Sequence, residues 1–396
     1  MELQFQGFRT EQGSPVHEAV SAARYYTSRD GKDPWLFAYT PVARMNPYQA
    51  LSYGSFGDHG LAVTPVTDPW SFDSLTVMGG QTEGVIVHLH WLSVVLADAR
   101  SAAEAAEKSA AFLAKMSAFR GKGGKIVWTV HNMVSHDARF LEEELRLQQG
   151  VADEADLIHV MTEDTPALVA QHLRLDPEKT ICVPHPGYHG AYPDVVPQDH
   201  ARLALGLDPD ETVYLAFGAI KAYKGIEKLV EGFNVLLERS PAPRRLIIAG
   251  GADQDRDTAA LVRQLRMHPY VLIDDSKIPL DTAQYLLRAA DLMVLPHVRA
   301  LNSGGALLGP TFGLPVVANS VGVLPGLLGP EIAEFIQGGT PGDIADALER
   351  ADRLRNEASR AAAREFADRY HPHTVSPVLA QAIRAGLHLD QGDSDA

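Results

Sequence analysis

The strongest constraint on the fold is a repeated alternation of short apolar segments with helical segments along most of the 396-residue chain. Segments such as 213–217 and 292–296 are continuous runs of strand-forming apolar residues, and helix-forming stretches such as 226–238 follow such segments. Strands that are apolar on both faces and joined by helices are typical of a parallel sheet covered by helices on both sides. We therefore expect an α/β fold of doubly wound, Rossmann-like parallel sheets.

A segment rich in Pro, Gly and Tyr at 185–198 interrupts this alternation and divides the chain. We predict an N-terminal Rossmann-like domain over 1–192, with a peripheral lead-in at 1–30, and a C-terminal Rossmann-like domain over 199–370. The remaining residues, 371–396, are expected to form a helix that returns to the N-terminal domain, followed by an acidic tail. Two such sheets in tandem should face each other across a cleft and bind ligands beyond the carboxyl ends of their strands.

The composition argues against several classes of function. The net charge is −15, with 50 acidic against 35 basic residues, which disfavours nucleic-acid binding and broad adhesion to an anionic membrane. The single cysteine, Cys182, allows no disulfide within the chain and fits a reducing, cytoplasmic compartment. We find no signal-peptide pattern and no apolar run of about 18 residues that could span a bilayer. Because Cys and His also lack the spacing of zinc ligands, we predict no bound metal.

One local segment runs against this acidic background. The stretch 100–125 has two glutamates and six cations: Arg100, Lys108, Lys115, Arg120, Lys122 and Lys125. Such a patch could make weak peripheral contact with acidic lipid at the inner membrane face. A solvated helix face is the simpler interpretation, and a soluble acceptor would need no membrane.

The loop after the apolar segment 213–217 carries two lysines close to a predicted helix. It begins at Gly218, contains Lys221 and Lys224, and ends at Gly225. Cations combined with the free N–H groups of a helix N-terminus suit a diphosphate. Two solvated surface lysines are the alternative interpretation.

The stretch 292–319 predicts two buried strands with a short helix between them. Asn302 and Ser303 are good N-cap residues for this helix, and Gly304 would let another group approach the backbone. The start of the helix is thus a natural seat for a phosphate, although an ordinary crossover fits equally well. Pro310 should shorten or kink the helix.

Histidines end two apolar strands of the N-terminal half. His88 and His90 close one strand, and His131 with Asn132 closes another. Histidines on apolar strands are commonly packed and hydrogen-bonded, but a position at the carboxyl end of a strand favours a functional role.

Five motifs occur in an order and at spacings that resemble one family: WTVHN, GAIKAYKG, LIIAGG, LLRAADLMVLPH and LNSGGALLGPTFGLPVVAN. Over about 35–370, the chain resembles the GT-B glycosyltransferases, in particular the family-4-like group that includes bacterial polysaccharide mannosyltransferases. The resemblance implies metal-independent transfer of a sugar from a GDP- or UDP-sugar, held by the C-terminal domain, to a hydroxyl of a saccharide, glycolipid or small-molecule acceptor. The nucleotide sugar would be a substrate, and no cofactor is expected.

The resemblance also implies roles for individual residues. Lys224 would meet the donor diphosphate, Lys221 would be a second cation there, and His131 would lie near the donor sugar. The other phosphate-binding candidates are Gly218, Arg299, Asn302, Ser303 and Gly304. The candidates on the side of the nucleotide base are Asp275, Ser276 and Lys277. The acceptor-side candidates are His88, His90, Asn132 and Asp137.

The most informative departure from the family pattern is the absence of a pair of glutamates. Typical members carry two glutamates eight residues apart that touch the donor sugar and the ribose, and the matching positions here are Ala300 and Leu308. Donor identity and the choice between retaining and inverting chemistry stay open, as does the oligomeric state. Two alternatives also remain, a GT-B sugar-nucleotide epimerase and a non-catalytic nucleotide-sugar-binding partner subunit.

Overall fold

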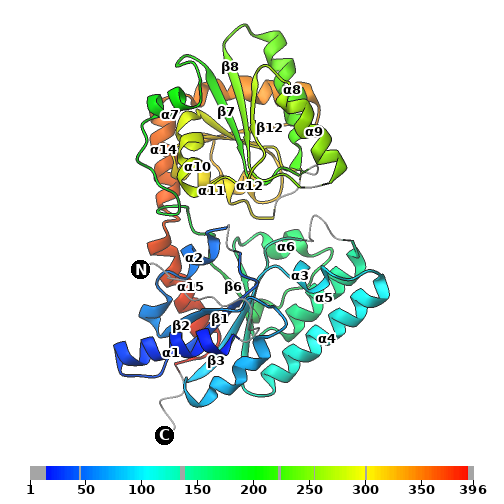
Figure 1. The fold of residues 1–396 in the computed structure, drawn as a ribbon, viewed down its shortest axis with the longest axis vertical. Helices are drawn as coiled ribbons and strands as arrows, with labels where there is room; N and C mark the ends of the chain where they lie inside the picture. The colour runs from blue at the N-terminus through cyan, green and yellow to red at the C-terminus, as the bar shows by residue number, and fades with distance from the viewer. Residues whose placement is uncertain are drawn as a thin grey trace. The chain divides into compact units, whose positions relative to one another are not determined.

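The computed structural model describes residues 15–43, 46–133, 139–221, 224–253, 255–298 and 301–390. The chain divides into two compact units, Met1–Pro186 together with Pro372–Ala396, and Gly187–His371 (Figure 1). Each unit contains one six-stranded sheet in which all neighbouring strands are parallel. The predicted α/β fold with two doubly wound parallel sheets is confirmed.

The sheet of the first unit has the strand order β2-β1-β3-β4-β5-β6. Its central strands are buried along almost their whole length, as expected of strands covered on both faces. The bounds are β1 Trp35–Thr40, β2 Leu61–Pro65, β3 Gly84–Leu89, β4 Lys125–Thr129, β5 Leu157–Val160 and β6 Thr180–Cys182.

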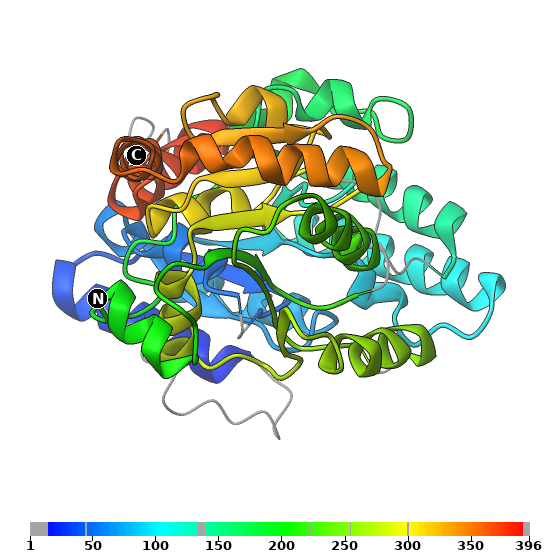
Figure 2. The ribbon, with the colours of Figure 1, turned by 90° about the horizontal axis from the view of Figure 1, so that it is seen from above.

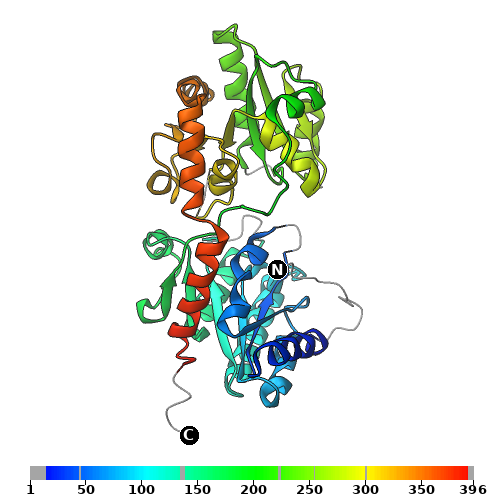
Figure 3. The ribbon, with the colours of Figure 1, turned by 90° about the vertical axis from the view of Figure 1, so that its left-hand side faces the viewer.

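Helices cover this sheet, and the last helix of the chain packs against α2 and η2 of the same unit (Figure 3). Apolar residues of α15, among them Leu379 and Ile383, join the core beneath the sheet. The α-helices are α1 Val16–Asp30, α2 Tyr48–Tyr53, α3 Ser93–Leu96, α4 Ala102–Arg120, α5 Leu141–Glu154, α6 Thr165–Val169 and α15 Pro372–Gly386. The 3₁₀ segments are η2 Phe56–His59, η3 Phe72–Gly80 and η4 Pro177–Lys179.

The sheet of the second unit has the order β12-β11-β10-β7-β8-β9. The order reverses between β10 and β7, and ligands of doubly wound sheets bind at the carboxyl ends of strands beside such a reversal. A ligand-binding site is therefore expected at the loops after β7 and β10. The bounds are β7 Thr212–Phe217, β8 Arg244–Ala249, β9 Val271–Asp274, β10 Leu292–Leu295, β11 Val316–Asn319 and β12 Ala333–Ile336.

Helices lie on both faces of this second sheet, as Figures 1 and 2 show. α8 packs against α13, α7 packs against α10, and α11 packs against α14. Leu229 and Phe233 of α8 are fully buried in the core that the helix covers. The helices are α7 Gln198–Ala204, α8 Ile226–Arg239, α9 Arg256–Arg266, α10 Leu280–Ala289, α11 Gly305–Thr311, α12 Leu324–Leu327, α13 Pro341–Arg350, η6 Ala351–Leu354 and α14 Glu357–Asp368.

The start of α11 differs from the prediction. Gly304 occupies the N-cap position, with φ −58° and ψ −33°, and no side chain caps the helix. Asn302 and Ser303 precede the cap, so their prediction as N-cap residues was wrong. The helix is seven residues long and contains Pro310, consistent with the predicted shortening.

Candidate functional site

The loop after β7 places two lysines at the carboxyl edge of the second sheet. Lys221 Nζ lies 3.2 Å from Oδ2 of Asp253. Lys224 is half-buried, and it forms no ion pair with any residue in the described part of the chain. Burial lowers the pKa of Lys224, the charge of Lys221 lowers it further, and Asp253 acts in the opposite direction. A half-buried cation without a counter-ion indicates a place where an anion can bind.

Two glycines bring the loops after β7 and β8 into direct contact. Gly250 has φ +146°, and a Cβ there would lie 2.2 Å from the carbonyl oxygen of Gly218. A Cβ on Gly218 would lie 3.7 Å from Nζ of Lys224. The lysine head group is thus close to bare backbone, and the contact of the two loops requires glycine at position 250.

The loop after β10 contributes the third part of this edge. A Cβ at Gly304 would lie 2.2 Å from the hydroxyl oxygen of Tyr188, so Gly304 permits the tyrosine to reach the start of α11. Ala306 N–H donates to the carbonyl of Ser303, and Leu308 N–H donates to that of Gly304. Arg299, predicted to bind phosphate, lies outside the described residues.

The predicted base-side residues follow β9, next to the loop after β8. Asp275 forms a 2.7 Å ion pair with Arg266, and this hydrogen bond lowers the pKa of the aspartate. Ser276 donates from its N–H and its hydroxyl to Oδ1 of Asp274. A Cβ on Gly251 would lie 3.3 Å from Cγ of Lys277. Asp275 is therefore engaged with Arg266, and Ser276 is engaged with Asp274.

A cavity of about 340 Å³ opens at the carboxyl ends of β10, β11 and β12. Its wall combines apolar and polar groups, among them Gly225, Lys228, Pro296, Asn319, Gln337 and Ile344. Gly225 follows Lys224 directly, so the cavity begins beside the lysine loop. Among the residues that the structure describes, none of the predicted site residues lines it.

Four histidines at the carboxyl edge of the first sheet belong to one hydrogen-bonded chain. His159 Nε2 lies 2.8 Å from the carbonyl oxygen of Val183, and its Nδ1 lies 2.9 Å from Oγ1 of Thr129. The same hydroxyl lies 2.6 Å from Nε2 of His88. The inner half of the chain thus runs from β6 through β5 and β4 to β3.

Tyr53 of α2 connects this inner half to the edge of the sheet. Its hydroxyl oxygen lies 3.0 Å from Nδ1 of His88 and 2.5 Å from Nε2 of His90. His90 Nδ1 lies 2.8 Å from Nε2 of His131. Burial is the main cause that lowers the pKa of His88, His90, His131 and His159, to about 4 for His159, so these rings are neutral at pH 7.

Aromatic rings hold the last histidine of the chain in place. Trp91 stacks on His131 with ring centroids 4.4 Å apart and an interplanar angle of 24°. Tyr48 meets the same imidazole edge to face at 5.1 Å and also packs against His185. The orientation of His131 is therefore set both by stacking and by hydrogen bonding.

Burial corrects the predicted acceptor side. His88 and His90 are 0% and 2% exposed, so they cannot themselves contact an acceptor and can act only through other residues. Asn132 is half-buried, and Asp137 lies outside the described residues. The sequence interpretation missed Tyr53, Thr129 and His159. The available signal was a polar residue near the end of each of three consecutive apolar strands.

Two further expectations concern metals and membranes. Within the described ranges, no group of three His, Cys, Asp or Glu side chains is arranged to hold a metal ion. No helix among those residues is long and apolar enough to span a bilayer. In the basic segment 100–125, Lys115 pairs with Asp73, and Arg120 pairs with Asp156 and Glu154.

Comparison with known proteins finds a family match for the part of the chain that contains Lys224. Residues 211–352 match the family of glycosyl transferases group 1. This matched range lies within the second unit, Gly187–His371. The matched range begins before β7 and ends in η6, so it contains both the lysine loop and the start of α11.

Relatives of known name show the same likeness. The chain is 30% identical over 271 residues to the D-inositol 3-phosphate glycosyltransferase of Gordonia bronchialis, which covers 64% of this chain and 58% of that protein. It is 31% identical over 248 residues to the protein of the same name from Mycolicibacterium smegmatis, covering 60% of this chain and 55% of that protein. The chain thus spans less than two thirds of the length of these relatives.

Solved structures agree on the architecture. The sucrose-phosphate synthase of Thermosynechococcus elongatus has a TM-score of 0.69 at 16% identity, over 90% of this chain and 100% of that chain. Anabaena HepE in complex with UDP has a TM-score of 0.65 at 17% identity, over 89% of this chain and 100% of that chain. At such identities the likeness shows the fold alone, and that fold is GT-B.

Proposed function

We propose that this chain transfers a sugar from a UDP- or GDP-sugar to a hydroxyl of a saccharide, glycolipid or small-molecule acceptor. The observation that carries the proposal is Lys224, a half-buried lysine without an ion pair among the described residues, at the carboxyl edge of a glycosyl transferases group 1 domain. A diphosphate would supply the missing counter-ion. Lys221 and the first N–H groups of α11 would share the charge.

The chemistry places the largest change of charge on the leaving group. The bond between the anomeric carbon and the diphosphate oxygen breaks, and its electron pair stays on the diphosphate while positive charge develops on the sugar. Lys224 and Lys221 would stabilise the growing negative charge. One such preorganised electrostatic contact is worth about 3–4 kcal/mol in the transition state.

The acceptor hydroxyl forms the new bond to the anomeric carbon and must lose its proton. In an inverting reaction His131 would take that proton, since a neutral imidazole is a competent base near pH 7. In a retaining reaction the leaving phosphate would take the proton, and His131 would position the sugar. The anomeric configuration of the product, measured by NMR, distinguishes these two routes.

Recognition of the ribose must differ from the usual family pattern. Leu308, at the position of the second family glutamate, is 5% exposed in α11 and has no polar group to offer. We propose that Ser276 and Lys277, after β9, contact the nucleoside instead. The place of Lys277 beside Gly251, in the loop after β8, supports this assignment.

The acceptor is proposed only as a class. The two relatives named above are D-inositol 3-phosphate glycosyltransferases, so a phosphorylated polyol belongs in any acceptor screen beside saccharides. For a lipid-linked acceptor, the proposed membrane contact is the basic segment 100–125. Its capacity is reduced because Lys115 and Arg120 are engaged in ion pairs.

The test begins with nucleotide binding. We expect UDP or GDP to raise the melting temperature of the protein by mass action, with about 2.7 kcal/mol of stabilisation at a hundred times the dissociation constant. The matching nucleotide sugar should then give a glycosylated product with one member of the acceptor screen, detected by mass spectrometry. Donor conversion without an acceptor would instead indicate an epimerase.

Lys224→Ala tests the assigned residue. Turnover should fall by about a hundredfold or more, and the nucleotide-dependent rise in melting temperature should shrink. Lys228→Ala is the matched control, because Lys228 is an exposed lysine in the first turn of α8 that lines the cavity beyond Gly225. If Lys228→Ala weakens nucleotide binding and Lys224→Ala does not, the diphosphate lies in that cavity and the assignment of Lys224 is wrong.

A further inference from the structure

The hydrogen-bonded chain of the first unit has a direction, and one backbone carbonyl sets it. A carbonyl oxygen only accepts, so His159 must donate from Nε2 to the carbonyl of Val183. A neutral imidazole carries one proton, and Nδ1 of His159 therefore accepts. Its partner is Thr129, whose hydroxyl has a single proton and must give it to His159.

The same rule settles each later step. Because the Thr129 proton is used, its oxygen accepts from Nε2–H of His88, and Nδ1 of His88 accepts from the hydroxyl of Tyr53. The Tyr53 oxygen then accepts from Nε2–H of His90. Nδ1 of His90 is left unprotonated, so it accepts from Nε2–H of His131.

We propose that this chain holds His131 as the tautomer with its proton on Nε2, and that Thr129, Tyr53 and His159 are positioning residues that act through His88 and His90. Nδ1 of His131 then carries a lone pair. In the proposed reaction, on which this part rests, His131 can accept a proton or a hydrogen bond from a substrate hydroxyl at Nδ1. It cannot donate a hydrogen bond from that atom.

The reverse direction is excluded by the inner end of the chain. If His131 accepted at Nε2, every proton would shift by one partner, and Nε2 of His159 would face the Val183 carbonyl without a proton. Only a doubly protonated His159 would avoid this repulsion. Burial opposes that state, since the pKa of His159 is lowered to about 4.

Long-range ¹H–¹⁵N correlation spectra of the histidine-labelled full-length chain test the tautomer without any substrate. His131→Asn assigns the His131 signals. We expect a protonated Nε2 and an unprotonated Nδ1 for His131 at pH 7. A protonated Nδ1 on this residue in the wild-type protein would overturn the proposal, whatever the protein proves to catalyse.

Removing one link tests the chain itself. Thr129→Val deletes the hydroxyl at nearly constant shape, and Tyr53→Phe does the same at the second neutral link. Each should shift the His131 signals toward a mixture of tautomers, while Thr129→Ser should restore the wild-type spectrum. If both Thr129→Val and Tyr53→Phe keep the wild-type His131 signals, the chain does not set the tautomer.

Matched controls come from the same sheet. Thr64→Val removes another buried threonine hydroxyl, one without a hydrogen-bond partner among the described residues. Tyr39→Phe removes the hydroxyl of a buried tyrosine that packs against Tyr53. Both controls should leave the His131 signals unchanged, which separates a specific chain from a general loss of packing.

The activity arm uses the same variants. Thr129→Val should lower turnover by roughly tenfold to a hundredfold, the range found for outer partners of metal-bound imidazoles. Thr129→Ser should stay within a few-fold of the wild type. If the tautomer shifts and turnover does not, the chain sets the state of His131 but His131 has no part in the rate-limiting step, and the catalytic half of the inference is wrong.

Discussion

The two units bury polar groups in different ways. At the carboxyl edge of the first sheet, the buried groups are neutral and form a single directed chain from Val183 to His131. The second unit also buries charged groups. Near the amino ends of its strands, buried arginines and aspartates are paired, whereas Lys224 at the carboxyl edge has no ion pair among the described residues.

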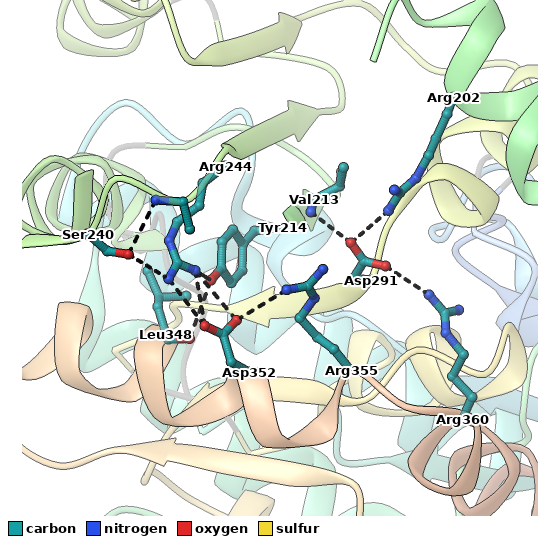
Figure 4. A network of polar contacts seen from close by, with 11 residues as sticks. Arg202, Val213, Tyr214, Ser240, Arg244, Asp291, Leu348, Asp352, Arg355 and Arg360 are labelled. Carbon is teal, nitrogen blue, oxygen red and sulfur yellow. Dashed lines mark hydrogen bonds and ion pairs between the residues drawn. The ribbon is translucent and has the colours of Figure 1, made fainter. Parts of the chain in front are cut away.

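Figure 4 shows the hydrogen bonds and ion pairs at the amino edge of the second sheet. Asp291, just before β10, accepts from Arg202 at 2.7 Å, from Arg360 at 3.2 Å and from the N–H of Val213 at 2.9 Å. The carboxylate thereby joins α7, β7, β10 and α14. Arg244, at the start of β8, similarly bonds Asp352, Tyr214 and Ser240.

This difference separates structural charge from charge kept for a ligand. A buried charge costs free energy unless a partner stabilises it, so the pairs around Asp291 and Asp352 belong to the folded unit itself. Lys224 bears a similar cost without an ion pair to any of the described residues. A chain of neutral hydrogen-bonded groups can have another role. The position of the proton at one end of such a chain sets the position of the proton at the other end.

Among the single substitutions, Asp291→Asn should give the largest loss of stability. It leaves Arg202 and Arg360 without a counter-ion, and breaking a buried pair on one side costs about 3–5 kcal/mol. Urea unfolding followed by far-UV circular dichroism measures this loss. Asp346→Asn is the control, since its pair with Arg239 is solvent-exposed and should be worth less than about 1 kcal/mol. Equal losses for both variants would contradict the contrast between paired buried charge and surface charge.

Acid should destabilise the first unit. The pKa values of His159 and His185 are lowered to about 4 in the folded chain, from about 6.5 in an unfolded one. The unfolded state therefore binds more protons between these values, and the free energy of unfolding falls as pH drops below 6.5. The expected slope is about 1.4 kcal/mol per pH unit for each histidine.

Tryptophan fluorescence reports this loss selectively, because all four tryptophans lie in the first unit. His159→Gln should reduce the slope between pH 6.5 and 4 by about one proton. The exposed His200 of the second unit is the matched site, and His200→Gln should leave the tryptophan transition unchanged. A slope in the wild type no steeper than in His159→Gln would rule out a neutral, buried His159.

Gly250→Ala should give the smallest of these losses, about 1–3 kcal/mol, by forcing a Cβ against the carbonyl of Gly218 at a strained φ. It should also weaken the nucleotide-dependent stabilisation, because it displaces the backbone beside Lys224. Gly206→Ala is the control, with φ +67° and no atom within 4 Å of the new Cβ. It should lower stability alone. Unchanged nucleotide binding in Gly250→Ala would show that the contact between these two loops is not part of the proposed site.

Much of the fold was predictable from local pattern. The strand expected at 245–249 is observed at Arg244–Ala249, since a continuous apolar run between polar segments leaves little choice of position. Helix ends were less accurate. The helix predicted at 97–119 begins at Ala102, because the Ser101 hydroxyl accepts from the N–H of Glu104 and caps it there. The short elements η3 and α7 were not predicted, since one or two turns carry too few residues to establish a period.

The lysine loop and the histidine chain also differ in how far the sequence predicts them. Lys221 and Lys224 could be found because they lie within one short loop between a strand and a helix. The histidine chain could not be derived, because it depends on the register that places Thr129 opposite His159 and on Tyr53 reaching across from α2.

The sequence by itself determined two parallel α/β sheets and a lysine loop at the carboxyl edge of the second one, because apolar runs, glycines and charges act over a few neighbouring residues. Only the tertiary structure decided that His88 and His90 are buried links, that Gly304 begins α11, and that Asp291 is enclosed by two arginines. Those outcomes depend on which segments lie next to each other in the folded chain. Hydrogen bonds between segments that are distant in sequence form only when the tertiary structure brings those segments together.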